Sequence, residues 1–417
     1  MIPKSGKKEQ GELFLVELST LIDRKNDLVK LRDKIDWERF EKKFESHYHP
    51  SHGSPGIRTR LLVGLLYLKY LSDLSDSEVL SGWVENPYWQ YFCGERYFQH
   101  ELPCDRSTLS KWRKRIGEDG ARELFKESLA AAFSSGALKL SYLGELYADT
   151  TVQEKNIAYP SEANLLNRAR LQLVKVCDAL GLRLRQKYTR VGKILQIKAH
   201  RYARANQWNR LRRTVKKLRT ILGRILREID RSGANKREEF EPILSLARKL
   251  YHSPETKEKV YSLHEPHVEA IAKGKTHKKF EFGNKVSVIR TRKRGFVVDC
   301  AALHGNPYDG HSLEPALARV EENLGAKIKA RIGVDLGYRG HGIAKVSCHR
   351  VLHPRLKRLP RLTRLFVRGR SAVEATISQM KRCFRLGRNY LARKIGDQMN
   401  ALFSAAALNL SKIILHS

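Results

Sequence analysis

The chain has 417 residues, which is enough for two or three domains and a substantial buried core. Its 80 lysine and arginine residues outnumber 44 acidic residues and give a formal net charge of +36, which indicates a polyanionic partner such as DNA or RNA. The six cysteines lack the paired short spacings of a zinc site, and no apolar run is long enough for a signal peptide or a membrane span. We therefore expect a cytoplasmic protein with no membrane partner. A ribosome-associated or merely basic protein is the alternative to a protein that acts on DNA or RNA.

The first third of the chain is predicted to be helical. Residues 1–50 have the pattern of a charged helical arm, and residues 51–140 that of a helical DNA-binding domain. Leucines from Leu61 to Leu71 recur at helical spacing and predict a core helix. A second, shorter helix is expected over residues 76–85, with Ser75 or Asp76 as its cap and an Asn-Pro turn after it.

A basic helix is predicted within CDRSTLSKWRKRIG, residues 104–117. Ser107 is expected to cap this helix. Leu109, Trp112 and Ile116 fall on one helical face, and Gly117 is expected to end the helix. The other face is predicted to carry the cations Lys111, Arg113, Lys114 and Arg115. A short helix of this kind after two other helices suits the second helix of a helix-turn-helix motif that reads DNA. A basic surface helix that contacts nothing is the alternative.

Residues 163–262 are predicted to form an all-helical insertion with a heptad stripe. The apolar positions alternate spacings of three and four: Trp208, Leu211, Val215, Leu218, Leu222, Ile225 and Ile229. The stripe needs a helical partner. We favour an antiparallel bundle within the chain over pairing between chains, because Gly181 and Gly233 supply turns.

The same insertion is strongly basic. Residues 201–231 hold eleven basic and two acidic residues, so the faces away from the apolar stripe offer a surface for phosphates. We expect Arg212 and Arg213 to contact DNA there.

An α/β pattern flanks the insertion. Strands are predicted at ELYAD (145–149), FEFGNKVSVI (280–289), GFVVDCAAL (295–303) and KIKARIGVD (327–335). Helices are predicted over residues 313–324, 371–386 and 392–414. The sequence therefore predicts one α/β domain, made of residues 141–162 and 263–417 and interrupted by the helical insertion.

Two aspartates close predicted strands in this domain. Cutting a phosphodiester needs two divalent metals about 3.5 to 4 Å apart, held by carboxylates. Asp149 ends one strand, and Asp335 ends another before a glycine turn that leaves room close to the backbone. Each aspartate taken alone is better explained as a turn residue at the end of a strand.

Glu374 is the third candidate ligand. Its predicted helix has a buried stripe of Val373, Ile377, Met380 and Phe384. On an adjacent face, Arg370 and Lys381 flank Glu374 at helical spacing. An exposed ion pair worth about 0.3 to 0.5 kcal/mol is the alternative. Because the helix follows two strand-end aspartates in a strongly basic chain, we expect Glu374 to complete a metal site, with Arg370 and Lys381 on phosphates.

Several motifs together resemble those of bacterial insertion-sequence transposases of the insertion sequence five type. They are DTTVQEKNIAYP (149–160), HEPHVEAIAKGKTHKKFEFGNKVSV (264–288), GVDLGYRG (333–340) and the spacing of Arg370, Glu374 and Lys381, while CDRSTLSKWRKRIG resembles the end of the family's amino-terminal domain. The likeness runs from about residue 57 onward. It implies a ribonuclease-H-like catalytic domain, Mg²⁺ chemistry, action on terminal inverted repeats, and Asp149, Asp335 and Glu374 as the catalytic triad.

The chain departs from this pattern in two places. Members of the superfamily often have Tyr three residues before the arginine, where this chain has Val367, so an aromatic contact to a displaced base does not carry over. The insertion also lies between the first and second strands, whereas better-known relatives place theirs before the glutamate helix. Asp299 and Asp309 are competing acids, but a strand interior and an Asp-Gly turn explain them.

The resemblance also implies a function. We expect a DDE transposase that binds terminal inverted repeats and cuts and joins DNA with two Mg²⁺ ions, for which Mn²⁺ can substitute. Its partners would be double-stranded end and target DNA and a second copy of the chain, in the nucleoid of a bacterium. A nuclease without strand transfer and an inactive or domesticated DNA-binding protein are the alternatives, although the intact triad argues against decay.

Overall fold

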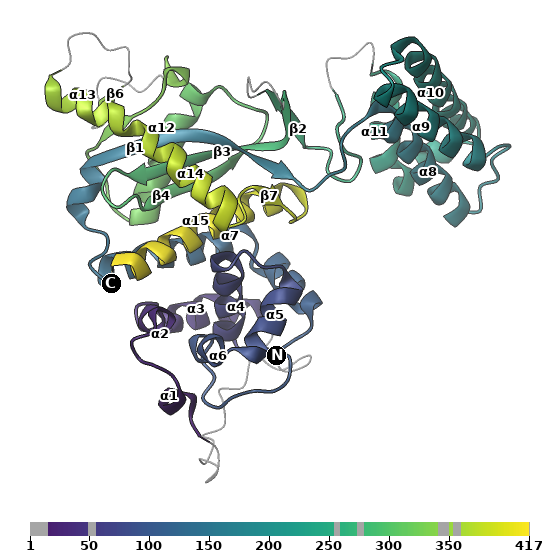
Figure 1. Ribbon diagram of the computed structural model, residues 1–417. Coiled ribbons are helices and arrows are strands. Elements are labelled where there is room, and N and C mark those ends of the chain that lie inside the picture. The colour runs from purple at the N-terminus through teal and green to yellow at the C-terminus, as the bar shows by residue number, and fades with distance from the viewer. Residues whose placement is uncertain are drawn as a thin grey trace. The chain divides into compact units, whose positions relative to one another are not determined.

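The chain divides into two compact units. The computed structural model describes residues 16–48, 56–253, 259–272, 279–340, 350–352 and 360–416. The first unit takes the described residues up to Glu154 and from Asn284 onward, and the second takes those from Lys155 to Gly283. Figure 1 draws both units.

The first unit begins with a helical region. Its helices are α1 (Leu18–Leu21), α2 (Asp27–Arg32), α3 (Trp37–Phe44), α4 (Thr59–Leu71), α5 (Asp76–Glu85), α6 (Pro87–Phe92) and α7 (Arg106–Ser134). Nearly every residue of α4 is buried, so this helix forms the centre of the region. As predicted, Ser75 caps α5, with a reciprocal hydrogen bond to Glu78, and α5 ends at Asn86.

The long helix α7 is interrupted at Gly117. This glycine has a φ of 61°, so the basic segment ends there as predicted, and a second helical segment continues to Ser134. Leu109, Trp112 and Ile116 are buried, which confirms the predicted apolar stripe. The predicted cap, Ser107, is wrong. Asp105 caps the helix by accepting a hydrogen bond from the amide of Ser107.

Most of a seven-stranded mixed sheet lies in the first unit, while residues 269–272 and 280–283 of this sheet belong to the second. The strands are β1 (Glu145–Lys155), β2 (Glu269–Ala272), β3 (Phe280–Thr291), β4 (Val297–Leu303), β5 (Arg331–Gly333), β6 (Arg350–Leu352) and β7 (Arg388–Asn389). The order is β2-β3-β1-β5-β6, with β4 paired to β3 and β7 to β1. Strands β1, β5 and β6 are parallel, whereas β2 and β4 are antiparallel to β3. β1 runs on past the predicted end at residue 149, because Thr150, Thr151 and Val152 favour extended backbone.

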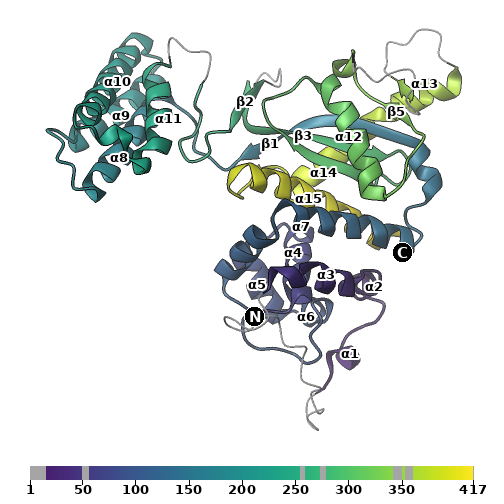
Figure 2. The same ribbon diagram turned by 180° about the vertical axis from the view of Figure 1, so that it is seen from behind.

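Four helices accompany the sheet: α12 (Asp309–Leu324), α13 (Arg361–Arg368), α14 (Ala372–Cys383) and α15 (Arg393–His416). Helix α15 is buried over most of its length and packs against α4, α7 and β4, so it joins the sheet to the amino-terminal helices (Figures 1 and 2). The buried stripe predicted for α14 is confirmed, since Val373, Ile377, Met380 and Phe384 are all at most 8% exposed.

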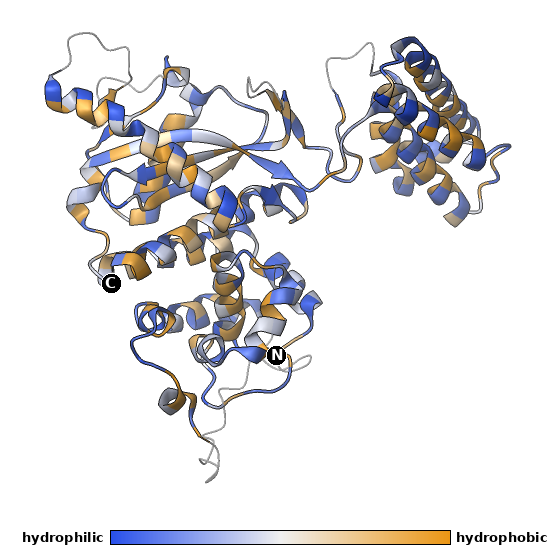
Figure 3. Ribbon diagram, viewed as in Figure 1, coloured by the Kyte–Doolittle hydropathy of each residue, from blue (hydrophilic) through white to orange (hydrophobic). Residues whose placement is uncertain are grey.

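The second unit contains a bundle of α8 (Glu162–Ala179), α9 (Thr189–Arg204), α10 (Trp208–Arg231) and α11 (Glu241–Tyr251). The predicted stripe of α10 is buried within this bundle from Val215 to Ile229, while Trp208 at its start is exposed. Gly181 and Gly233 both have positive φ after helices, as turns require. Figure 3 shows hydrophobic and hydrophilic residues interspersed along these helices, and α9 exposes the hydrophobic side chains of Val191, Ile194 and Ile197. In the described part of the chain, no helix has the length and apolar character needed to cross a membrane.

Candidate active site

The three candidate carboxylates come from three separate elements. Asp149 lies in the middle of β1, not at its end as predicted, and its side chain is 15% exposed. Asp335 follows β5 and caps a short 3-10 helix, where it accepts a hydrogen bond of 2.9 Å from the amide of Gly337. Glu374 lies in the first turn of α14 and is 61% exposed. β1 and β5 are parallel neighbours, and Tyr147 pairs with Gly333. Asp149 and Asp335 each follow this pair by two residues, so they lie at the same level along adjacent chain segments.

Arg370 joins two of these carboxylates. Its guanidinium donates to Asp149 Oδ2 at 3.1 Å and to Glu374 Oε1 at 3.0 Å. Arg370 thus makes the ion pair with Glu374 that was the alternative, because the start of α14 brings it between the two acids, while its expected contact with a phosphate stays a prediction. Its charge offsets the repulsion between them.

The electrostatics of Asp149 tie the three acids together. Burial raises the pKa of Asp149 to about 6, and the negative charges of Asp335 and Glu374 act in the same direction. The amide of Thr150 and the guanidinium of Arg370 oppose this rise. The three carboxylates are therefore close enough to influence one another, although they are far apart in the sequence.

A fourth carboxylate, Asp309, belongs to the same neighbourhood. A Cβ placed on Gly337 would lie 3.1 Å from Asp335 Oδ1 and 3.3 Å from Asp309 Oδ2, so the two side chains are close neighbours. Asp309 accepts hydrogen bonds of 3.0 Å from Thr150 Oγ1 and from Lys285 Nζ. The prediction of a turn residue is wrong: Asp309 is the first residue of α12. The helical pattern that follows residue 309 was the available signal.

Tyr147 holds the chain segment that precedes Arg370 in place. Its ring stacks on Phe366 of α13, and its hydroxyl donates to the Phe366 carbonyl at 2.9 Å. A Cβ on Gly369 would come within 2.5 Å of the Tyr147 hydroxyl, so only glycine allows this contact. The chain is thereby held against β1 directly before Arg370.

The donor chemistry of the site fits a hard divalent cation. Carboxylate oxygens are the ligands that Mg²⁺ prefers, and Asp149, Asp335 and Glu374 all present them. Among the residues that the structure describes, no three histidine, cysteine or acidic side chains are grouped closely enough to hold a metal ion. Asp149 and Glu374 are instead both paired with Arg370.

Lys381 lies apart from the carboxylates. It is near the end of α14, seven residues beyond Glu374, which corresponds to about 10 Å along a helix. There it lines a hollow with Asp73, Asp76 and Glu78 of the amino-terminal region. The structure therefore brings together Asp149, Asp335, Glu374 and Arg370, but not Lys381.

The predicted basic face of α7 is only partly exposed. Lys111, Lys114 and Arg115 are exposed, whereas Arg113 is 6% exposed and donates to both carboxylate oxygens of Asp76, at 2.8 and 2.6 Å. The prediction that Arg113 lies on the exposed face is wrong. Arg113 is four residues after Leu109 and three before Ile116, so helical spacing already placed it beside the apolar stripe.

The other predicted DNA contacts lie in the second unit. Arg212 and Arg213 are both exposed on α10, away from the buried stripe. Their position is compatible with the phosphate contacts expected from the sequence.

Residues 16–115, which reach from the start of the described chain into the basic segment of α7, match a family model described as a transposase domain. Over 206 residues the chain is 47% identical to an uncharacterized protein, ORF8 in the nfe locus, of Rhizobium meliloti. That alignment covers 49% of this chain and 98% of the relative. The chain belongs to a transposase-related family. No solved structure matches it.

The family match and the carboxylates lie in different parts of this transposase-related chain. The matched domain ends at residue 115, before Asp149, and contains the exposed cations of α7. The family match therefore does not extend to the acidic site.

The raised pKa of Asp149 predicts a pH-dependent cost to folding. An unfolded aspartate has a pKa of about 3.9, and in the folded chain it is about 6. Burial thus favours the protonated form: this group's contribution to stability is present below pH 4 and is lost as the pH rises through 6. Asp149→Asn should therefore raise the free energy of unfolding by about 2 to 3 kcal/mol at pH 8 without divalent ions, with little effect at pH 4. Urea unfolding at both pH values measures this difference, and a variant less stable than the wild type at pH 8 would contradict it.

Proposed function

We propose that this chain is a DDE transposase of the insertion sequence five type, which binds terminal inverted repeats and carries out cleavage and strand transfer of DNA. The observation that carries the proposal is the proximity of three carboxylates from a strand, a turn and a helix: Arg370 bridges Asp149 and Glu374, and the charge of Asp335 acts on Asp149. The transposase-related family and the net charge of +36 support it independently.

A ribonuclease-H-like fold is part of this proposal. The support is the mixed sheet, in which parallel strands β1, β5 and β6 adjoin the antiparallel pair of β3 and β4. In such a sheet the carboxylates on β1 and after β5 lie on rigid backbone, which a catalytic site needs.

The proposed chemistry assigns a role to each side chain. Asp149, Asp335 and Glu374 would hold two Mg²⁺ ions, which supply activation of water and stabilisation of charge on the scissile phosphate. Arg370 releases Asp149 and Glu374 and turns its guanidinium to a DNA phosphate, for which its planar donors are suited. Lys285 and Thr150 hold Asp309 beside Asp335, so Asp309 is a positioning residue.

DNA binding is proposed for two basic surfaces, with the chain acting as a homodimer in the bacterial nucleoid. Lys111, Lys114 and Arg115 of α7 would contact the terminal repeats, and Arg212 and Arg213 of α10 would contact phosphates of any sequence.

The test begins with the DNA that flanks the gene. Matched inverted repeats bounded by a short duplication are the expected finding. A labelled duplex that carries one such end should then be cut by the purified chain in Mg²⁺ or Mn²⁺, at the end of the repeat, leaving a 3′ hydroxyl that joins target DNA. Cutting without joining would favour a nuclease, and specific binding without cutting would favour an inactive, domesticated DNA-binding protein.

A further inference from the structure

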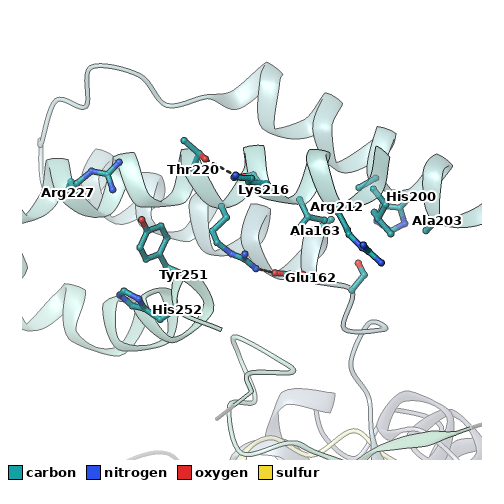
Figure 4. Close-up of a pocket in the computed structure, with 15 residues that line it drawn as sticks. Glu162, Ala163, His200, Ala203, Arg212, Lys216, Thr220, Arg227, Tyr251 and His252 are labelled. Atoms are coloured by element: carbon teal, nitrogen blue, oxygen red, sulfur yellow. Dashed lines mark hydrogen bonds and ion pairs between the residues drawn. The ribbon is translucent and has the colours of Figure 1, made fainter. Parts of the chain in front are cut away.

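The helical unit contains an elongated groove along α10. Its volume is about 790 Å³, and residues of α8, α9, α10 and α11 line it. Small and apolar side chains make its floor, among them Ala163, Ala199 and Val215. Figure 4 shows Arg212 and His200 toward one end of the groove, and Arg227 and Tyr251 toward the other.

A row of cations follows one side of the groove. Arg212, Lys216 and Arg227 are spaced at whole turns of α10, and all three are exposed. In the described part of the chain, none of the three has an acidic side chain within ion-pair distance. Arg219, in the same row, is paired with Glu162. A linear row of unneutralised cations suits a linear polyanion.

An aromatic ring interrupts the row of cations. Gly223 occupies the position of the row between residues 219 and 227, and a Cβ there would come within 2.5 Å of the Tyr251 ring. The absent side chain thus makes room for Tyr251 of α11, which also contacts His252 edge to face. Cations that can bind phosphates and a half-buried tyrosine ring therefore line the groove along one row, above an apolar floor.

We propose that this groove binds a single strand of DNA, with phosphates on the α10 cations and a base stacked on Tyr251. Cationic grooves with interspersed aromatic side chains bind single strands because unpaired bases expose their faces. A duplex keeps its bases stacked inside and offers only phosphates to this surface. That the strand is DNA rests on the proposed function; the affinity of the groove for a single strand does not.

The test measures binding of a fluorescent 15-nucleotide oligothymidylate to the full chain in EDTA, by anisotropy, at several salt concentrations. Lys216→Glu with Arg227→Glu should weaken binding at least tenfold and reduce the salt slope by about 1.4, since each single-strand phosphate contact contributes about 0.7. The matched control is Lys217→Glu with Arg231→Glu, two exposed cations of α10 that do not line the groove. It should weaken binding less than threefold.

Substitutions of Tyr251 separate stacking from charge. Tyr251→Leu should weaken oligothymidylate binding about tenfold without changing the salt slope, whereas Tyr251→Phe should bind like the wild type. Equal effects of the groove and control variants would overturn the proposal. So would a duplex that binds as tightly as the single strand, together with a neutral Tyr251→Leu.

The outcome for the groove is separable from that for catalysis. Loss of the proposed single-strand site with normal Mg²⁺-dependent cutting of end DNA would refute only the groove. Single-strand binding in a chain that never cuts DNA would refute the proposed function and leave the groove standing.

Discussion

If the proposed function holds, replacing Asp149, Asp335 or Glu374 with Ala should abolish Mg²⁺-dependent cutting of end DNA, by at least about a thousandfold for each variant, while the chain should still fold and bind DNA. Each carboxylate would supply a metal ligand that no neighbouring group can replace, and a fixed charge at a phosphoryl-transfer site is commonly worth 10² to 10³ in rate or more. Glu374 is largely exposed and Asp335 is held by a backbone amide, so neither substitution removes core packing. Cutting is measured on a labelled end fragment, and folding by circular dichroism.

Substitutions of two other acidic residues provide the comparison for these variants. Asp309→Asn should reduce cutting only about 10- to 100-fold and raise the Mg²⁺ concentration needed, because Asp309 acts through its neighbours. Glu322→Ala should leave cutting unchanged, since this exposed residue pairs with Lys126. If the triple Ala variant still cuts DNA in Mg²⁺, the assignment of the triad is wrong.

Arg113→Ala should destabilise the folded chain by about 3 kcal/mol. Arg113 and Lys69 are each 7% exposed in their side chains, and both donate to Asp76, so the three charges form a buried cluster between α4, α5 and α7. Burial opposes ionisation of Asp76, but the hydrogen bonds and charges of Arg113 and Lys69 outweigh it and hold its pKa at about 2. Removing Arg113 leaves Asp76 with half of its partners, and breaking a buried pair commonly costs 3 to 5 kcal/mol. Denaturant unfolding measures the loss.

Lys111 provides the matched comparison, because it is exposed on the same turn of α7. Lys111→Ala should change the free energy of unfolding by less than about 0.5 kcal/mol and should weaken preference for the terminal repeats. Because the pKa of Asp76 is lowered to about 2, its ionised form stabilises the fold above pH 4, and this stabilisation is lost as the pH falls toward 2. The free energies of unfolding of Arg113→Ala and Lys111→Ala should therefore converge in acid. An Arg113→Ala variant that melts like the wild type but fails to bind DNA would show that Arg113 contacts DNA and does not stabilise the fold.

Local patterns predicted the helices well and the strand ends poorly. The cap at Ser75 and the stripe of α14 follow from residues within one or two turns, and both are confirmed. The continuation of β1 beyond Asp149 depends on pairing with strands that are distant in the sequence. Strand pairing is decided by partners and not by the segment alone.

The candidate site was accessible from the sequence only in outline. Strand-end aspartates and a glutamate beside an apolar stripe indicated three carboxylates, and the structure does bring these residues together. The bridge of Arg370 to Asp149 joins residues 221 positions apart, and Asp309 acquires its place from Lys285 and Thr150. No spacing rule describes contacts of this kind, since they arise from the packing of whole elements.

The position of the helical insertion bears on the order in which the chain folds. β1 and β3 are neighbours in the sheet, yet the whole bundle of α8 to α11 is synthesised between them. During synthesis β1 must wait with an unpaired edge until β3 emerges, and unpaired edges invite aggregation. The bundle depends on contacts that are local in sequence, so it can fold during this interval. Asp149 therefore lies on a strand that stays without its β3 partner until the bundle has been synthesised.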